Sequence, residues 1–330
     1  MALPSIMRKL FRNDGYGPLL KPEIIPFATG LASNGAEAAT TEWVKDLSVA
    51  PVYLDPNGSD SNDGLSSETP VQTFEKAMEI GYSLPGSHIK LIAAAGTYNS
   101  SLVVSGATVQ VVFLGNTTIN GQIASLNTSF VALTYEGTEP TVTVSYTSHS
   151  NVNTHNAVAY AHGNSYLYIH VALNVSGGNS SVSAECLIGA YVNSIVLMNK
   201  SIQASGYAEV CVNASRNSGI DIEATLTGAS DANIDRFIFA SIRSVIYLAY
   251  NVTGTSKYTA INATYGSMFY CNATITVTTT TGNDYYSVYI SNNSYVEINT
   301  LVLNRNHSTA GGVAFLVFDH SCANCNSITI

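Results

Sequence analysis

The sequence predicts an all-β chain wound into a parallel β-helix, and three observations support this fold class. A Ser followed by alternating apolar residues recurs through the C-terminal half at intervals of 23 to 29 residues. The residues two and four positions after each Ser are apolar in every repeat. The repeats are rich in Val, Ile, Tyr and Thr, which favour strands over helices. A repeat of this length with a strand period is typical of coils that stack on one another.

The stacked coils predict vertical files of apolar side chains inside the β-helix, with three short strands in each coil. The repeat is marked by Ser165, Ser194, Ser218, Ser244, Ser267, Ser294 and Ser321. Two residues later stand Leu167, Val196, Ile220, Ile246, Phe269, Val296 and Ala323, and four residues later Ile169, Met198, Ile222, Leu248, Cys271, Ile298 and Cys325. The file eight residues after the Ser holds Leu173, Ile202, Leu226, Val252, Ile275 and Val302. Strict alternation means that one face of each strand is buried.

Residues 51–83 are expected to close the N-terminal end of the β-helix, whose coils then run from about residue 88 to residue 330. A short strand leads into a turn-rich loop, and a short amphipathic helix follows. The buried side of this helix is expected to comprise Phe74, Ala77 and Met78. Without a cap, the first coil would expose its core and a row of unpaired backbone groups.

This cap segment resembles the start of pectate-lyase-like β-helix proteins. The residues that carry the resemblance are Gly58-Ser-Asp60, Asp63-Gly-Leu-Ser66 and Thr69-Pro70. The resemblance implies that the parallel β-helix is right-handed. It implies no particular activity, because the group includes lyases, hydrolases, adhesins and phage spikes.

The acidic loop of the cap has two interpretations. Asp55, Asp60 and Asp63 carry the hard oxygen ligands that calcium prefers, although the Gly and Glu positions of an EF-hand are absent. The alternative is that these residues serve turn formation alone. No other cofactor is expected.

Residues 1–50 differ in kind from the β-helix of residues 51–330. Residues 10–28 are punctuated by Gly and Pro, with apolar residues between them, and they cannot form a core alone. This stretch resembles the short leaders of phage tail-fibre proteins, which dock on the virion. We therefore expect a virion-attachment leader and linker that binds a phage tail or baseplate protein. A disordered leader is the alternative.

The composition argues against several classes of function. Charged residues make up only 11% of the chain, the net charge is −9, and no Lys/Arg run exceeds two residues, so nucleic acid is not an expected partner. No apolar run reaches the roughly 18 residues that a membrane span requires. The basic pair Arg8-Lys9 follows a short apolar stretch, which is the wrong order for a secretory signal. Five scattered cysteines argue against a disulfide framework. Cys322 and Cys325 are interpreted as core fillers rather than metal ligands.

The outward file three residues after each Ser is the predicted glycan-binding surface. It comprises Tyr168, Leu197, Asp221, Tyr247, Tyr270, Glu297 and Asn324. The rings of Tyr168, Tyr247 and Tyr270 can lie on sugar rings, and Glu297 can accept hydrogen bonds from sugar hydroxyls. The same aromatic face suits the interface of a homotrimer, and the sequence leaves both interpretations open.

Asp221 and Glu223 form the candidate catalytic pair. They are two residues apart on one strand face, which places them about 7 Å from each other. Glycoside hydrolysis needs two such carboxylates, one as acid and one as base or nucleophile. The alternative is that both are solvated surface acids on a Lys-poor protein.

These features predict a homotrimeric phage tail fibre or tailspike subunit that recognises a host cell-surface polysaccharide. It would be assembled into the virion in the host cytoplasm and would act outside the cell. Depolymerase activity is left open. A free secreted polysaccharide lyase or hydrolase and a bacterial surface adhesin are the alternatives, and the missing export signal disfavours both. The chain stops inside a repeat, which suggests a partner over the last strand or a longer protein.

Overall fold

The computed structural model describes residues 50–85, 88–146, 156–179, 182–228, 233–280, 287–305 and 315–329. The chain separates into two units, Met1–Ala50 and Pro51–Ile330. The predicted leader lies outside the described residues, apart from Ala50 at its end. Among the described residues, no helix is long and apolar enough to cross a membrane.

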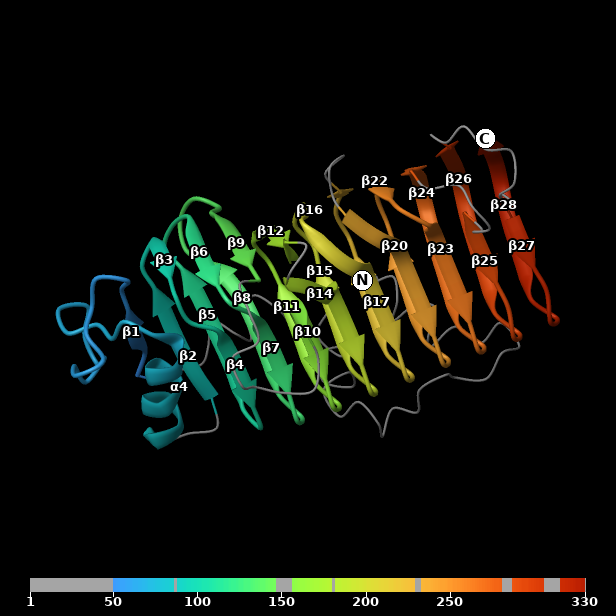
Figure 1. The fold of residues 1–330 in the computed structure, drawn as a ribbon. Coiled ribbons are helices and arrows are strands. Elements are labelled where there is room, and N and C mark those ends of the chain that lie inside the picture. The colour runs from blue at the N-terminus through green and yellow to red at the C-terminus, as the bar shows by residue number, and fades with distance from the viewer. Residues whose placement is uncertain are drawn as a thin grey trace. The chain divides into compact units, whose positions relative to one another are not determined.

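The described part of the second unit forms a right-handed parallel β-helix, which confirms the predicted fold class (Figure 1). Strands of three series follow one another along the chain, and each series pairs in parallel from coil to coil. The first series is β2 (His88–Ala93), β5 (Thr108–Phe113), β8 (Phe130–Tyr135), β11 (Tyr166–Ile169), β15 (Ile195–Met198), β18 (Gly219–Ile222), β21 (Val245–Leu248) and the first parts of β24 (Met268–Thr279), β26 (Tyr295–Arg305) and β28 (Cys322–Thr329). The second series is β3 (Gly96–Tyr98), β6 (Thr117–Asn120), β9 (Thr141–Ser145), β12 (Ala172–Ser176), β16 (Ile202–Ser205), β19 (Leu226–Gly228), β22 (Val252–Ser256) and the later parts of β24, β26 and β28. The third series is β4 (Leu102–Ser105), β7 (Ile123–Leu126), β10 (Ala157–His162), β14 (Val182–Tyr191), β17 (Tyr207–Ser215), β20 (Asn233–Ser241), β23 (Thr259–Thr264), β25 (Val288–Ile290) and β27 (Phe315–Val317), and β13 (Gly178–Asn179) pairs antiparallel with β14.

The predicted core files are confirmed for the first strand series. Val196 pairs with Ile220, and Ile220 pairs with Ile246. The same register continues through Phe269 to Val296. All five side chains are fully buried in one core cluster, so equivalent residues of successive coils stack inside a single lumen.

The predicted file of the second strand series is correct as far as Ile275 and wrong at Val302. Ile275 pairs with Leu301, which is fully buried, whereas Val302 is half-buried. The register of β24 against β26 shifts between Cys271 and Thr274. A shift of one residue turns a strand side chain to the opposite face, so Val302 lies on the outer side.

The recurring serines form a hydrogen-bonded ladder at the turn before the first strand of each coil. The Ser194 N–H donates to Ser218 Oγ at 3.2 Å, and the Ser218 N–H donates to Ser244 Oγ at 3.2 Å. The same bond joins each neighbouring pair of serines from Ser129 to Ser321. Each Ser follows two residues with positive φ, so the chain makes a tight left-handed turn just before the strand. The repeat marker in the sequence is therefore a hydroxyl that accepts the backbone N–H of the preceding coil.

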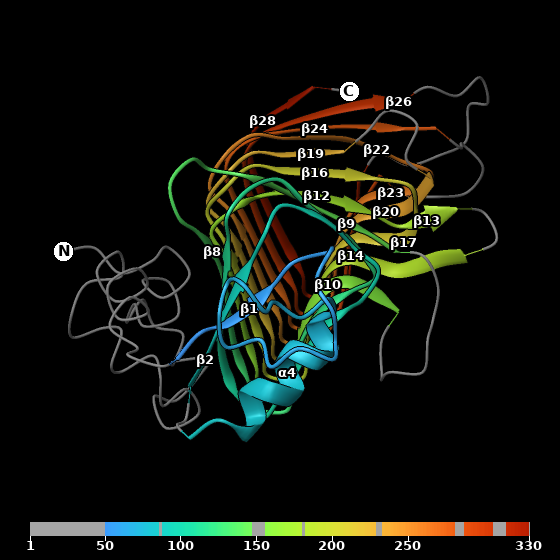
Figure 2. The same ribbon diagram turned by 90° about the vertical axis from the view of Figure 1, so that its left-hand side faces the viewer.

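The helix α4 (Phe74–Ser83) lies beside β1 (Val52–Leu54) at the N-terminal end of the coil stack, where the sequence placed a cap (Figure 2). Its buried side comprises Phe74, Ala77, Met78 and Gly81. The close approach of α4 to β2 requires a glycine, because a Cβ at Gly81 would lie 2.5 Å from Ile89 Cγ2. The cap therefore packs its apolar side on the first coil.

Candidate functional site

The residues of the predicted glycan-binding file are aligned in one strip on the outer side of the first strand series. Parallel pairing aligns Tyr168, Leu197, Asp221, Tyr247, Tyr270, Glu297 and Asn324 in that order. These residues alternate along their strands with the core residues. Their side chains therefore leave the strands on the face opposite the lumen.

The exposure of this strip changes along the β-helix. Tyr168, Leu197, Asp221 and Tyr247 are buried, with at most 7% of each residue exposed. Tyr270 and Glu297 are half-buried, and Asn324 is exposed. Alternation in the sequence predicts the side of the sheet on which a residue lies, but it carries no signal for what covers that side. Of the four predicted glycan-binding residues, the accessible ones are Tyr270 and Glu297.

We call the accessible part of the strip the tyrosine patch and define it by Tyr270, Tyr295 and Glu297. The ring centroids of Tyr270 and Tyr295 are 5.7 Å apart, with planes inclined at 50°. Tyr295 Oη donates to Glu297 Oε2 at 3.1 Å. Burial, with the nearby Glu297 carboxylate, raises the pKa of Tyr295, so the phenol stays protonated as the donor. Two tilted rings beside a carboxylate offer an apolar surface for a sugar ring and an acceptor for its hydroxyls.

A second polar and aromatic cluster lies where the first strand series turns into the second. The Tyr135 ring stacks on His170, with centroids 5.6 Å apart. His170 Nδ1 lies 2.8 Å from Asn199 Oδ1, and Asn199 Nδ2 donates to Tyr168 Oη at 2.8 Å. No sequence pattern links Tyr135 to this cluster, because only the stacking of coils brings it beside His170. This network fixes the buried Tyr168 hydroxyl and leaves it little freedom to meet a sugar.

A lysine contacts the Tyr135 ring of the same cluster. Lys200 Nζ lies 5.5 Å from the Tyr135 ring centroid and donates to Glu139 Oε2 at 2.8 Å. The hydrogen bond to Glu139 raises the pKa of Lys200. Glu139 and Lys200 are 61 residues apart in the chain, and no local sequence pattern predicts their contact. The ammonium is thus already engaged by a carboxylate and a ring.

The candidate catalytic pair lies at the end of β18. Asp221 is fully buried, whereas Glu223 is half-buried. The Glu223 N–H donates to the Met198 carbonyl at 2.7 Å, which holds this residue in the ladder between coils. A general acid or base must reach the bond that it cleaves. The arrangement does not present Asp221 to a polysaccharide, and catalysis by this pair stays a prediction.

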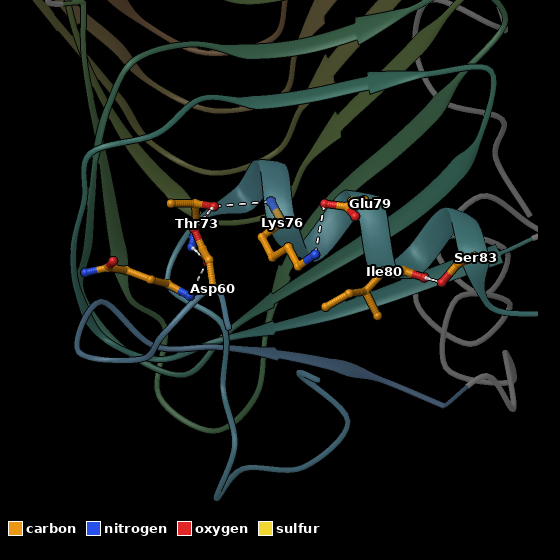
Figure 3. A network of polar contacts seen from close by, with 7 residues as sticks. Asp60, Thr73, Lys76, Glu79, Ile80 and Ser83 are labelled. Carbon is orange, nitrogen blue, oxygen red and sulfur yellow. Dashed lines mark hydrogen bonds and ion pairs between the residues drawn. The ribbon is translucent and has the colours of Figure 1, made fainter. Parts of the chain in front are cut away.

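The acidic loop of the cap is held by internal hydrogen bonds. Asp60 Oδ1 accepts the N–H groups of Gln72 and Thr73 at 2.9 and 3.0 Å, and Asp60 Oδ2 accepts Thr73 Oγ1 at 2.8 Å (Figure 3). Burial acts to raise the pKa of Asp60, but these bonds and the charge of Lys76 outweigh it, so the pKa is lowered. Thr73 also caps α4 through the Lys76 N–H. Asp60 therefore ties the loop to the first turn of the helix.

The other two predicted calcium ligands serve separate turns. Asp55 Oδ1 accepts the Asn57 N–H at 2.8 Å, and Asp63 Oδ1 accepts Thr69 Oγ1 at 2.7 Å. The hydrogen bond from Thr69 lowers the pKa of Asp63. In the described ranges, no group of three or more His, Cys, Asp or Glu side chains could hold a metal ion. Calcium binding here stays a prediction.

The cysteines offer no reactive thiolate in the interior. Burial raises the pKa of Cys211 to about 12 and that of Cys271 to about 11. The Cys186 pKa is also raised by burial, and its Sγ lies 3.0 Å from Tyr191 Oη. Since the thiolate is the nucleophile, these buried thiols are unreactive at neutral pH. Cys325 is half-buried and packs against the core, as its place in the repeat predicted. Cys322 is exposed, so its interpretation as a core filler is wrong, because it lies at an outward position of its strand.

Comparison of the chain with protein-family models, with curated proteins and with solved structures gave no match. The kinship with pectate-lyase-like proteins therefore stays a prediction that rests on residues 58–70.

Proposed function

We propose that this chain is a phage tail fibre or tailspike subunit that recognises a host cell-surface polysaccharide through the outer side of its β-helix. The observation that carries the proposal is the tyrosine patch on β24 and β26. Its two rings and its carboxylate are partly exposed on strands that pair on both sides. A rigid sheet that presents aromatic rings beside an acceptor is suited to binding sugars, since little ordering is needed on binding.

The proposal favours adhesion over catalysis. Asp221 is buried, and the interior thiols hold their protons. The cap acids are engaged in turns. In this proposal residues 1–50 bind a tail or baseplate protein, and three copies assemble side by side on the virion. The free secreted enzyme and the bacterial adhesin are the alternatives to this assignment.

A binding assay with a tyrosine double variant tests the tyrosine patch. Tyr270→Ala with Tyr295→Ala should lower the retention of the protein on host polysaccharide by about tenfold or more, because stacking on each ring contributes roughly 0.5–1.5 kcal/mol. Affinity electrophoresis measures the retention. Tyr250→Ala is the control, since Tyr250 is 55% exposed and is not one of the three residues of the tyrosine patch. Equal losses in both variants would show that the patch has no special role.

A competition assay tests the virion role. The purified chain should block adsorption of the phage that encodes it, and soluble host polysaccharide should reverse the block. Reducing-sugar release from the same polysaccharide reports depolymerase activity, and Asp221→Asn with Glu223→Gln then tests the acid pair. A chain that neither binds the polysaccharide nor competes with the phage would refute the proposal.

A further inference from the structure

The outer side of the second strand series carries a continuous file of uncharged residues, all of them polar except Val302. Parallel pairing aligns Thr97, Thr118, Thr143, Asn174, Gln203, Thr227, Thr253, Thr276, Val302 and Thr329 in that order. Figure 2 shows β12, β16, β19 and β22 of this series running side by side. Successive coils are about 4.8 Å apart, so the file presents one side chain at each such step, and this side chain is polar in every coil except that of Val302.

The two neighbouring files are also uncharged and, apart from Ala172, polar. One holds Thr141, Ala172, Ser201, Thr225, Asn251, Thr274, Thr300 and Ser327, and the other holds Asn120, Ser145, Ser176, Ser205, Thr255, Thr278 and Asn304. We call the three files together the hydroxyl–amide face. None of these residues is charged, and every one is at least partly exposed. The chain has 35 charged residues in all, 13 basic and 22 acidic, and none of them stands in these three files.

The hydroxyls of the central file are available to a ligand. Within the described residues, the side chains of Thr143, Thr227, Thr253 and Thr276 form no hydrogen bond to another residue. A threonine hydroxyl can donate one hydrogen bond and accept two. This distinguishes the face from the turn serines, whose hydroxyls hold neighbouring coils together.

The composition of the face indicates what it binds. The cores of protein–protein interfaces are enriched in aromatic residues, Met and Arg, and are depleted in Ser. The three files contain no aromatic residue, Met or Arg, so a second copy of this chain is a poor fit. An acidic polymer would find no cation there. Sugar hydroxyls, like those of Thr, both donate and accept, and an uncharged sugar polymer brings no charge to be desolvated.

We propose that the hydroxyl–amide face binds an uncharged polysaccharide laid along the β-helix axis. This inference rests on the proposed function and adds to it the class of glycan and a second contact surface. Each hydroxyl contributes one weak hydrogen bond. Because the hydroxyls repeat over successive coils, one polymer can form many such bonds at the same time. Affinity should therefore rise with the length of the oligosaccharide.

The central file allows hydroxyl groups to be removed by Thr-to-Val substitutions and one to be added by a Val-to-Thr substitution. Val302 shows that valine is accommodated in this file, and valine favours strands as threonine does. The variant T227V/T253V/T276V removes three hydroxyls, and V302T adds one. The control is T138V, because Thr138 is exposed in the loop between β8 and β9. Affinity electrophoresis of the full chain uses dextran, mannan and galactan as uncharged probes and alginate as the acidic probe.

We expect at least one uncharged polymer to retard the chain, and the triple variant to weaken that binding about tenfold. V302T should strengthen it, and T138V should leave it unchanged. Full affinity in the triple variant, with loss in the tyrosine double variant, would overturn this inference and leave the proposed function intact. Binding to alginate alone would also overturn it. A change of oligomeric state in sedimentation, instead of a loss of binding, would assign the face to a second copy. Failure to bind any polysaccharide, the host's included, would remove both proposals.

Discussion

At the scale of single residues, the β-helix depends on hydroxyls that complete backbone hydrogen bonds between coils. Ser218 is 3% exposed, and its Oγ accepts the N–H of Ser194. The left-handed turn before each Ser leaves this N–H without a partner in its own coil. An unsatisfied buried N–H costs about 1–3 kcal/mol. An alanine in place of the Ser would fit the space but has no oxygen to accept a hydrogen bond from this N–H. This explains why serine, rather than any small residue, marks the repeat.

Ser218→Ala should therefore lower the free energy of unfolding by about 1–3 kcal/mol. Urea unfolding followed by circular dichroism measures the change. Ser201→Ala is the matched control, since Ser201 is exposed, and it should change stability by less than about 0.5 kcal/mol. Equal stability of the Ser218 variant and the unaltered protein would show that the ladder is dispensable.

At the scale of elements, the sequence was informative where a pattern spanned several repeats. The core files at Ile220 and Ile222 followed from a constant offset to the Ser, and the structure confirms them. The position of Val302 differs from the predicted one because the register shifts once, between Cys271 and Thr274, and a single irregularity leaves no periodic signal in the sequence. The burial of Tyr168 was also unpredictable, because alternation is the same on a covered face and an open one. Contacts such as Lys200 with Glu139 arise only from the stacking of coils.

The cap depends on the carboxylate of Asp60, which accepts three hydrogen bonds at the start of α4. Asp60→Asn weakens three hydrogen bonds to the start of α4. The free energy of unfolding should fall by about 1–3 kcal/mol, and the midpoint of thermal unfolding should fall by several degrees. Glu79→Gln is the control, because the Lys76–Glu79 pair lies on the surface and contributes little.

The pH dependence of the cap follows from the lowered pKa of Asp60. A carboxyl whose pKa is lower in the folded state than its usual 3.8 stabilises the fold above that value. This contribution should disappear as the pH falls below 3.8 and through the folded-state pKa. The midpoint of thermal unfolding of the unaltered protein should therefore fall as the pH is lowered through this range. The midpoint of the Asp60→Asn variant should fall less over the same range. Parallel pH profiles of the two proteins would contradict this account.

At the scale of the whole molecule, the β-helix is a one-dimensional stack in which each coil contacts its two neighbours. In the described residues, the pairings of the first strand series run from β1 and β2 to β28 without a break. Stability in such a stack is approximately a sum over coils and over the interfaces between them. A defect in one coil should then weaken its neighbours more than the distant cap. This arrangement lets the outer faces vary while the lumen holds the coils in register.

A cavity in the middle of the stack tests this locality. Ile246→Ala removes a fully buried side chain that stacks between Ile220 and Phe269, and it should cost about 2–5 kcal/mol. Hydrogen exchange should accelerate most in β18, β21 and β24, while β1 and β2 keep their protection. Leu114→Ala, at a side chain that is 51% exposed, should leave the exchange pattern unchanged. Faster exchange by the same factor in every coil would instead mean that the β-helix opens as one cooperative unit.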